Sequence, residues 1–127
     1  MNTIMVPVSV GELIDKITIL EIKAERISQE NRRRNVLVEL EGLLPLWREL
    51  LAQSPALEGL KASLRGINER MWDVQDALRA KEAAQDFGAG FIDLARAVAA
   101  RNGERVAVKN EINRLAGSQF VEEKQYR

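Results

Sequence analysis

Apolar residues repeat along this sequence at spacings of three and four, which is the period of a helix that buries one side. The repeat predicts four helices, at about residues 10–28, 32–53, 55–84 and 90–116. The third repeat is the most regular and holds its spacing over about three heptads. Its members are Leu57, Leu60, Leu64, Ile67, Met71, Val74 and Leu78. We therefore predict an all-α fold, an elongated four-helix bundle that forms a single domain over residues 1–127.

The first helix has a clear start signal. Residues 3–8 alternate loosely, with Ile4, Val6 and Val8 on one side and Pro7 on the other, which is typical of a short extended arm. Ser9 is followed three residues later by Glu12, the spacing of a capping box, and Val8 and Leu13 occupy the positions of a hydrophobic staple. Ser9 is therefore predicted to be the N-cap of the first helix.

Two of the predicted helices contain residues that disfavour helical backbone. Pro45 removes a backbone donor inside the second helix, so we expect a kink or a break near this residue. Asn102 and Gly103 form a turn dipeptide inside the fourth helix, but the apolar spacing runs through that segment without a skip. We therefore predict a continuous fourth helix that ends at Gly117 as its C-cap.

Two apolar surfaces lie outside the main helical stripes. The tail at residues 118–127 carries Phe120, Val121 and Tyr126, enough apolar surface to dock on the bundle. The first helix carries Thr18, Ile19 and Ile22 on the side opposite its main stripe. A helix that is apolar on two sides is usually buried on both, and in so short a chain the second side most simply meets another subunit. The arm or the tail could cover it instead, but we predict a homodimer.

Composition limits the chemistry that the chain can perform. Nineteen basic and nineteen acidic residues give a net charge of zero, which offers no bulk attraction to nucleic acid or to an anionic membrane. The absence of Cys and His excludes disulfides, thiolate nucleophiles, Ser-His pairs and most transition-metal sites, so we expect no metal and no cofactor. A charged leader and a bilayer-spanning run are also absent, which predicts a cytoplasmic location.

The most informative residues are polar ones at positions where the pattern calls for apolar side chains. On the fourth helix, Arg101 and Arg105 occupy stripe positions, while Asn102 and Lys109 lie within roughly 40 to 60 degrees of the stripe centre. Asn113 extends the same polar edge by one turn. Charges taken from water cost several kcal/mol each unless they are paired, so these cations need anionic partners.

The first and third helices supply further inward polar side chains. Glu21 projects inside the apolar arc of the first helix, whereas Asp15, Lys16 and Lys23 are predicted to point away from it. The polar or amphipathic residues on one flank of the third helix are Asn68, Trp72 and Gln75. These inward side chains are predicted to form a polar pocket between the helices.

Two interpretations of these residues remain open. In the first, only Glu21 and an edge residue, Glu41, form ion pairs with the three inward cations, and a bound carboxylate or phosphate balances the remaining positive charge. That binding protein or small enzyme would use Arg101, Asn102, Arg105, Lys109, Glu21 and Asn68. Alternatively, the cations reach solvent or form structural ion pairs, and the protein is a non-catalytic interaction or assembly module. We favour the assembly module.

The two ends of the chain carry motifs that resemble a known family. The opening at residues 6–23 reads VPVSVGELIDKITILEIK and the ending at residues 121–126 reads VEEKQY. Both resemble a family of small bacterial proteins that is classed only as a domain of unknown function, and the resemblance covers nearly the whole chain. It implies a bacterial, helical, cytoplasmic protein, and it supplies no activity to transfer.

The first helix is also similar in character to that of the all-helical chorismate mutases. The bundle of those enzymes holds a dicarboxylate with Arg and Lys and needs neither His nor Cys, so the resemblance implies that such chemistry is compatible with this composition. However, the leading arginine of their first helix has no counterpart here, and the spacing from Asp15 to Arg26 differs by one residue. We treat this second resemblance as an analogy.

Overall fold

The computed structural model describes residues 2–118 and 122–123. Four helices and no strand occur in these residues, which confirms the predicted all-α fold. The helices are α1 (Val10–Arg26), α2 (Glu30–Gln53), α3 (Leu57–Ala83) and α4 (Ala89–Ala116). α1 is shorter than the apolar repeat predicted, because Ile27 takes extended backbone angles and acts as its C-cap. α2 begins earlier, because the Gln29 side chain caps it by accepting from Arg32 N.

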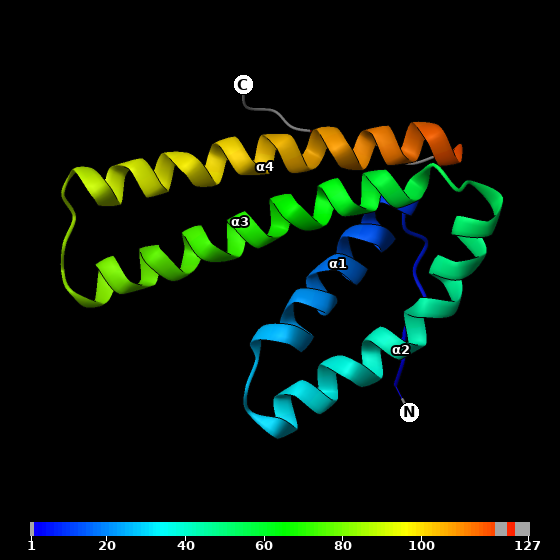
Figure 1. Ribbon diagram of the computed structural model, residues 1–127, viewed down its shortest axis with the longest axis horizontal. Coiled ribbons are helices and arrows are strands. Elements are labelled where there is room, and N and C mark those ends of the chain that lie inside the picture. Colours follow the sequence, from blue (N-terminus) through cyan, green and yellow to red (C-terminus); the bar gives the residue numbers. More distant parts are fainter. Residues whose placement is uncertain (1, 119–121, 124–127) are drawn as a thin grey trace.

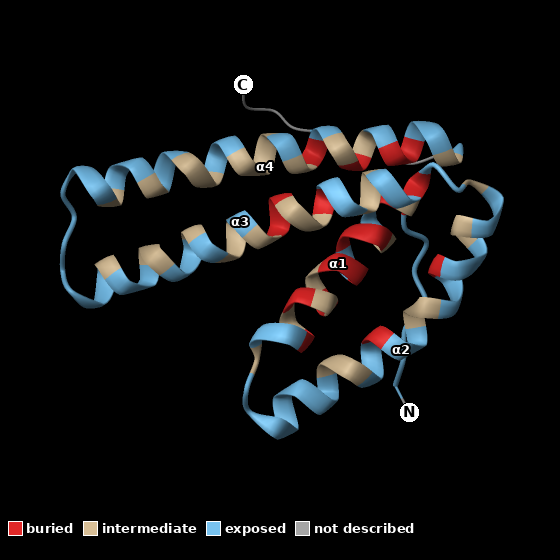
Figure 2. Ribbon diagram, in the orientation of Figure 1, coloured by how far each residue is buried: buried red, intermediate tan, exposed pale blue. Residues whose placement is uncertain are grey.

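The helices form two antiparallel hairpins that cross. α3 and α4 pair along a long hairpin, α1 crosses one half of it, and α2 packs on the other side of α1 (Figure 1). The buried residues gather on α1 and on the parts of α3 and α4 that lie against it (Figure 2). The core cluster consists of Ile14, Ile17, Leu20, Leu40, Trp47, Leu57, Leu64 and Ile112.

α1 is enclosed on two sides by other helices of the same chain. Thr18 has no exposed surface, Ile22 is 1% exposed, and Ile19 is partly buried. α3 covers this side of α1, since Asn68 on α3 donates a hydrogen bond to the Thr18 hydroxyl at 2.9 Å. The prediction that this side of α1 meets another subunit is therefore wrong, because α3 and α4 fold back over it.

Both predicted caps are present. The Ser9 hydroxyl accepts a hydrogen bond from Glu12 N at 3.1 Å, which satisfies one of the free backbone donors at the start of α1. Gly117 ends α4 with φ 69°, in the left-handed region that glycine enters without steric cost. Local sequence signals therefore fixed the start of α1 and the end of α4.

The two helices that contain helix-disfavouring residues are continuous. α4 runs through Asn102 and Gly103 without interruption, as predicted. α2 also continues through Pro45, and its ribbon changes direction along its length (Figure 1). Pro45 is exposed to solvent, where water can hydrogen-bond the carbonyl group that loses its donor.

Candidate functional site

A cluster of charged side chains joins α1, α3 and α4, and Asp15 lies at its centre. The Asp15 residue is 3% exposed. Its carboxylate accepts hydrogen bonds from Arg105 Nε at 2.9 Å, from Arg105 Nη2, and from Asn68 Nδ2 at 2.9 Å. The prediction that Asp15 points away from the buried surface is wrong, because α1 buries its second side against α3 and α4.

Lys109 occupies the neighbouring position on α4 and is also buried, at 3% exposure. Its Nζ donates to Glu12 Oε1 at 2.5 Å and to Glu122 Oε1 at 2.6 Å, and it lies 3.9 Å from Asp15 Oδ2. Burial by itself would lower the pKa of Lys109, but the hydrogen bonds that Lys109 donates to Glu12 and Glu122 outweigh it and raise the pKa. Lys109 therefore remains an ammonium ion inside the protein.

Arg105 is held in the same way. The hydrogen bonds that Arg105 donates to the Asp15 carboxylate raise the pKa of Arg105 against the opposing effect of burial. The guanidinium presents two of its nitrogens to the two carboxylate oxygens, which is the bidentate geometry that fixes both side chains. This pair ties the middle of α4 to the first half of α1.

The expected excess of positive charge is absent from the described part of this cluster. Arg105 and Lys109 meet three carboxylates, those of Glu12, Asp15 and Glu122. The cations are thus neutralised by the chain itself, and the charge argument for a bound anion among them loses its basis.

Asn68 lies in the cluster, as predicted, but its amide group is used for structure. Its Nδ2 donates to both Asp15 Oδ1 and Thr18 Oγ1, each at 2.9 Å. The Thr18 hydroxyl in turn donates to the Asp15 backbone carbonyl at 2.8 Å. Both amide hydrogens of Asn68 therefore hold Asp15 and Thr18 in place, and α3 is joined to α1 at this point.

Glu21 and Arg101 lie outside the cluster. Glu21 pairs with Lys61 Nζ at 3.0 Å and with Arg65 Nη1 at 3.5 Å, both on α3. Arg101 pairs with Glu104 on its own helix at 2.8 Å, and its Nε is buried with no hydrogen-bond partner among the described residues. Asn102 is partly buried on α4. The structure therefore brings together Arg105, Lys109 and Asn68 from the predicted set and separates Glu21 and Arg101 from them.

Sequence reasoning missed Gly11. Its backbone N–H donates to Asn113 Oδ1 at 2.7 Å, and a Cβ built on Gly11 would lie 2.5 Å from the Lys109 carbonyl oxygen. The signal was present in the spacing, since Gly11, Asp15, Thr18 and Ile22 follow each other at intervals of four, three and four. That spacing marks a second buried face on α1.

The C-terminal segment contributes to the cluster through Glu122. Asn110 Nδ2 donates to the Glu122 carbonyl at 2.8 Å, and Glu122 N donates to Asn110 Oδ1 at 2.9 Å. This reciprocal pair docks residue 122 on α4, where its carboxylate reaches Lys109. The predicted contacts of Phe120, Val121 and Tyr126 lie outside the described residues.

A hollow of about 260 Å³ opens beside the cluster, between the second half of α1 and the α3–α4 hairpin. Its lining residues are Ile19, Ile22, Lys23, Asn68, Met71, Trp72, Gln75 and Arg105. The polar flank predicted for the third helix, Asn68, Trp72 and Gln75, therefore does border a pocket between helices. Lys23 lines this hollow as well, contrary to the prediction that it points away.

The fold and the cluster define a small all-helical protein whose buried ion pairs join α1, α3 and α4 to the C-terminal segment. The chain belongs to a family of unknown function, DUF6165, whose model matches residues 4–127. No curated protein and no solved structure matches the chain.

The described residues offer neither a membrane span nor a metal site. None of the helices there combines the length and the apolarity that crossing a bilayer requires. No group of three or more acidic side chains in that part of the chain is arranged to hold a metal ion.

Proposed function

We propose that the protein is a non-catalytic assembly module that pairs with a second copy of itself. The contact surface in this proposal is the part of the α3–α4 hairpin at residues 69–105, which we call the outer hairpin, and most of it lies beyond α1. The observation that carries the proposal is the burial pattern of this segment. Between residues 69 and 105 no residue is buried, although the apolar repeat continues through both helices.

The apolar side chains of the outer hairpin stay partly exposed, although α3 and α4 pack on each other there. Those that remain partly exposed are Met71, Val74, Leu78, Phe91, Leu94 and Val98. Figure 2 shows that the red, buried positions end where α1 leaves the hairpin. In a helical bundle, a third or fourth helix normally completes the burial of such a stripe.

The lengths of the helices explain why α1 does not cover the outer hairpin. At 1.5 Å per residue, the 17 residues of α1 span about 26 Å, whereas the 27 residues of α3 span about 40 Å. α1 also crosses the hairpin at an angle instead of lying along it (Figure 1). A second outer hairpin has matching length and a matching stripe, so two copies would complete a four-helix layer around a twofold axis.

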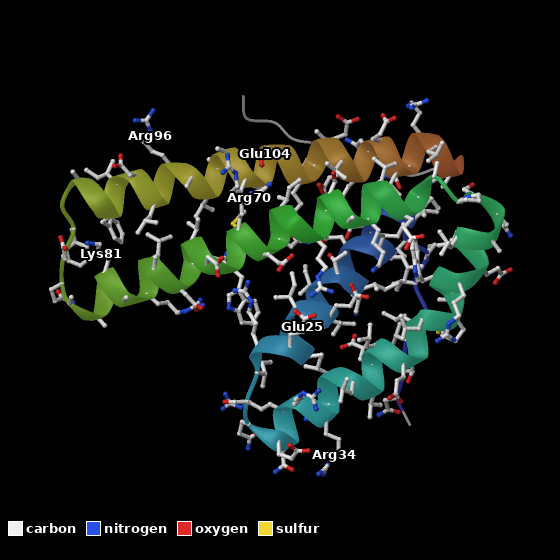
Figure 3. The ribbon with its side chains drawn as sticks, viewed as in Figure 1. Glu25, Arg34, Arg70, Lys81, Arg96 and Glu104 are labelled. Carbon is white, nitrogen blue, oxygen red and sulfur yellow. The ribbon has the colours of Figure 1, made fainter. Side chains whose placement is uncertain are left out.

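Charge does not oppose the pairing of two copies. The chain has a net charge of zero, so identical molecules carry no long-range repulsion. Some charged groups of the outer hairpin pair with each other or point outward: Arg70 Nη2 lies 3.8 Å from Glu104 Oε2, and Arg96 projects away from the hairpin (Figure 3). The apolar stripe is therefore free to meet an identical surface.

The charged cluster supports a non-catalytic role. Asp15 and Lys109 are buried and have protein partners, so neither is presented to a substrate. The alternative prediction placed an anionic metabolite among Arg101, Arg105 and Lys109. That alternative required inward cations without carboxylate partners, but Arg105 and Lys109 form ion pairs with the carboxylates of Glu12, Asp15 and Glu122.

Sedimentation velocity over about 1 to 100 µM protein tests the proposal, because the mass of a reversible dimer depends on concentration. We expect a dimer at the upper end. Val98→Glu places a charge on the outer hairpin and should weaken dimerisation at least about tenfold, since an unpaired charge in an interface is costly.

The matched control is Val38→Glu on α2, where the side chain is 67% exposed and lies outside the outer hairpin. It should dimerise like the wild type. Circular dichroism shows whether each variant keeps its helices. A monomer at every concentration of the wild-type protein, or equal effects of the two substitutions, would contradict the proposal.

A further inference from the structure

The hollow beside the charged cluster has the composition of a small-molecule site. Ile19, Ile22 and Met71 supply apolar walls, and Trp72 supplies an aromatic face. The remaining lining residues are Lys23, Asn68, Gln75 and Arg105, so two cations and no carboxylate line it. Apolar walls with a few converging polar groups are typical of ligand pockets.

Lys23 is the lining cation that has no ion-pair partner among the described residues. The residue is partly buried, and no carboxylate of the described residues lies within ion-pair distance of its Nζ. By contrast, the other lining cation, Arg105, is paired with Asp15. A partly desolvated ammonium ion without a counter-ion is stabilised by a bound anion.

Arg105 can donate a further hydrogen bond to an anion that binds in the hollow. Its Nε and Nη2 are occupied by the Asp15 carboxylate, which leaves Nη1 without a hydrogen bond to a described residue. Because Asp15 already balances the charge of Arg105, the net positive charge at the hollow is close to that of Lys23 alone. One unbalanced positive charge matches a monoanion better than a dianion.

Trp72 is held in position at the side of the hollow. The Arg26 guanidinium lies 5.8 Å from the centroid of the Trp72 ring, and Arg26 Nη1 is fixed by Asp73 Oδ1 at 2.5 Å. An indole ring that is already fixed offers apolar and aromatic contact at low entropic cost. The body of a ligand would therefore meet Trp72, Ile19 and Met71.

We propose that this hollow binds a small aromatic or branched-chain carboxylate, with the carboxylate at Lys23 and Arg105 and the apolar body against Trp72. The proposal goes beyond the assembly role and does not depend on it. A volume of about 260 Å³ suits a single ring with its acid group.

Isothermal titration calorimetry with four probes tests the proposal. Benzoate carries the ring and the charge, benzamide carries the ring without the charge, acetate carries the charge without the ring, and phenyl phosphate carries a second negative charge. We expect benzoate to bind measurably and each of the other three to bind more weakly. Tighter binding of phenyl phosphate would overturn the carboxylate assignment, and equal binding of benzamide would overturn the role of Lys23.

Lys23→Gln is the decisive variant, and it should weaken benzoate binding about tenfold, since it removes a charged hydrogen-bond donor. Lys16→Gln is the matched control on the same helix. Lys16 pairs with Glu39 at 2.7 Å outside the hollow, so this change should leave benzoate binding as in the wild type. Trp72→Leu should weaken binding about fivefold.

Three outcomes would overturn the proposal: no saturable binding of benzoate up to about 10 mM, equal binding by Lys23→Gln and the wild type, or equal loss in Lys16→Gln. Val98→Glu distinguishes the hollow from the assembly role, because this variant should dimerise more weakly and still bind benzoate. Failure of the benzoate titration leaves the sedimentation result untouched, and a monomeric protein can still carry the hollow.

Discussion

Gly11 lets the first turn of α1 touch the backbone of α4. A Cβ at this position would lie 2.5 Å from the Lys109 carbonyl oxygen and 3.0 Å from Asn113 Oδ1. The same Asn113 oxygen accepts the hydrogen bond from Gly11 N. Because the closest atom belongs to backbone, a methyl group can be accommodated only if the two helices move apart.

We therefore predict opposite effects for two glycine substitutions. Gly11→Ala should lower the free energy of unfolding by about 1–3 kcal/mol, through overpacking against Lys109. Gly59→Ala on α3 has no atom within 4 Å of the added Cβ, and it should raise the free energy of unfolding by about 0.5–1 kcal/mol, as expected of alanine in an open helical position. Urea denaturation measures both, and a shared sign would contradict this explanation.

At the scale of the elements, the ion pair of Asp15 and Arg105 connects α1 to α4. Asp15 belongs to α1 and Arg105 to α4, and Asn68 on α3 donates to the same carboxylate. Removing the charge on one partner leaves the other buried or half-buried without compensation, whereas replacing both removes the penalty as well.

Asp15→Asn should therefore lower the free energy of unfolding by about 3–5 kcal/mol. Each single substitution, Asp15→Asn or Arg105→Met, leaves one charge without its partner, whereas the double variant leaves none. The double variant should therefore lose less free energy of unfolding than the sum of the two single losses. Glu39→Gln is the control, since its pair with Lys16 is exposed and should contribute less than about 1 kcal/mol. Additive losses in urea denaturation would mean that Asp15 and Arg105 act independently.

The helix ends show what local sequence determines at this scale. Ser9 and Gly117 were predicted because a side-chain cap and a left-handed residue act within one turn of the chain. The continuity of α2 through Pro45 depends on more than the local pattern. The apolar residues of α2 on both sides of Pro45, such as Leu40 and Trp47, are buried in one core, which holds the two parts of the helix together.

At the scale of the whole molecule, Lys109 joins three parts of the chain, since Glu12 lies on α1 and Glu122 in the C-terminal segment. Its pKa in the folded protein is raised above the ordinary 10.5. A raised pKa contributes stability that is fully present below the ordinary value and is lost as the pH rises through the folded-state value. The molecule should therefore lose this contribution as the pH rises above about 10.5.

The measurement compares the wild type with Lys109→Met by urea denaturation between about pH 8 and 12. We expect the wild type to be more stable at the lower pH values and the difference to shrink as Lys109 loses its proton. The two proteins differ at this one position, so effects of the alkaline pH on the rest of the chain cancel in the difference. A difference that stays constant to the highest pH would show that Lys109 contributes through packing alone.

The sequence by itself determined the number and type of the helices, and it also marked the inward polar positions Asn68, Arg105 and Lys109. The helices and the inward polar positions can both be read from the periodicity of the sequence. The three-four spacing identifies the buried side of each helix, and a polar residue at a position on that side departs from the apolar pattern. Composition likewise limited the chemistry, because residues that are absent from a chain cannot act in it.

Only the tertiary structure decided which side chains meet. Asp15 pairs with Arg105 across 90 positions, and Glu12 meets Lys109 across 97. Such pairs depend on which side of α1 is covered by the α3–α4 hairpin. Because α1 has two buried sides, its apolar spacing alone does not show which of them meets that hairpin. The choice was made by α3 and α4 folding back over the Gly11 face, where a missing side chain lets two helices come into backbone contact.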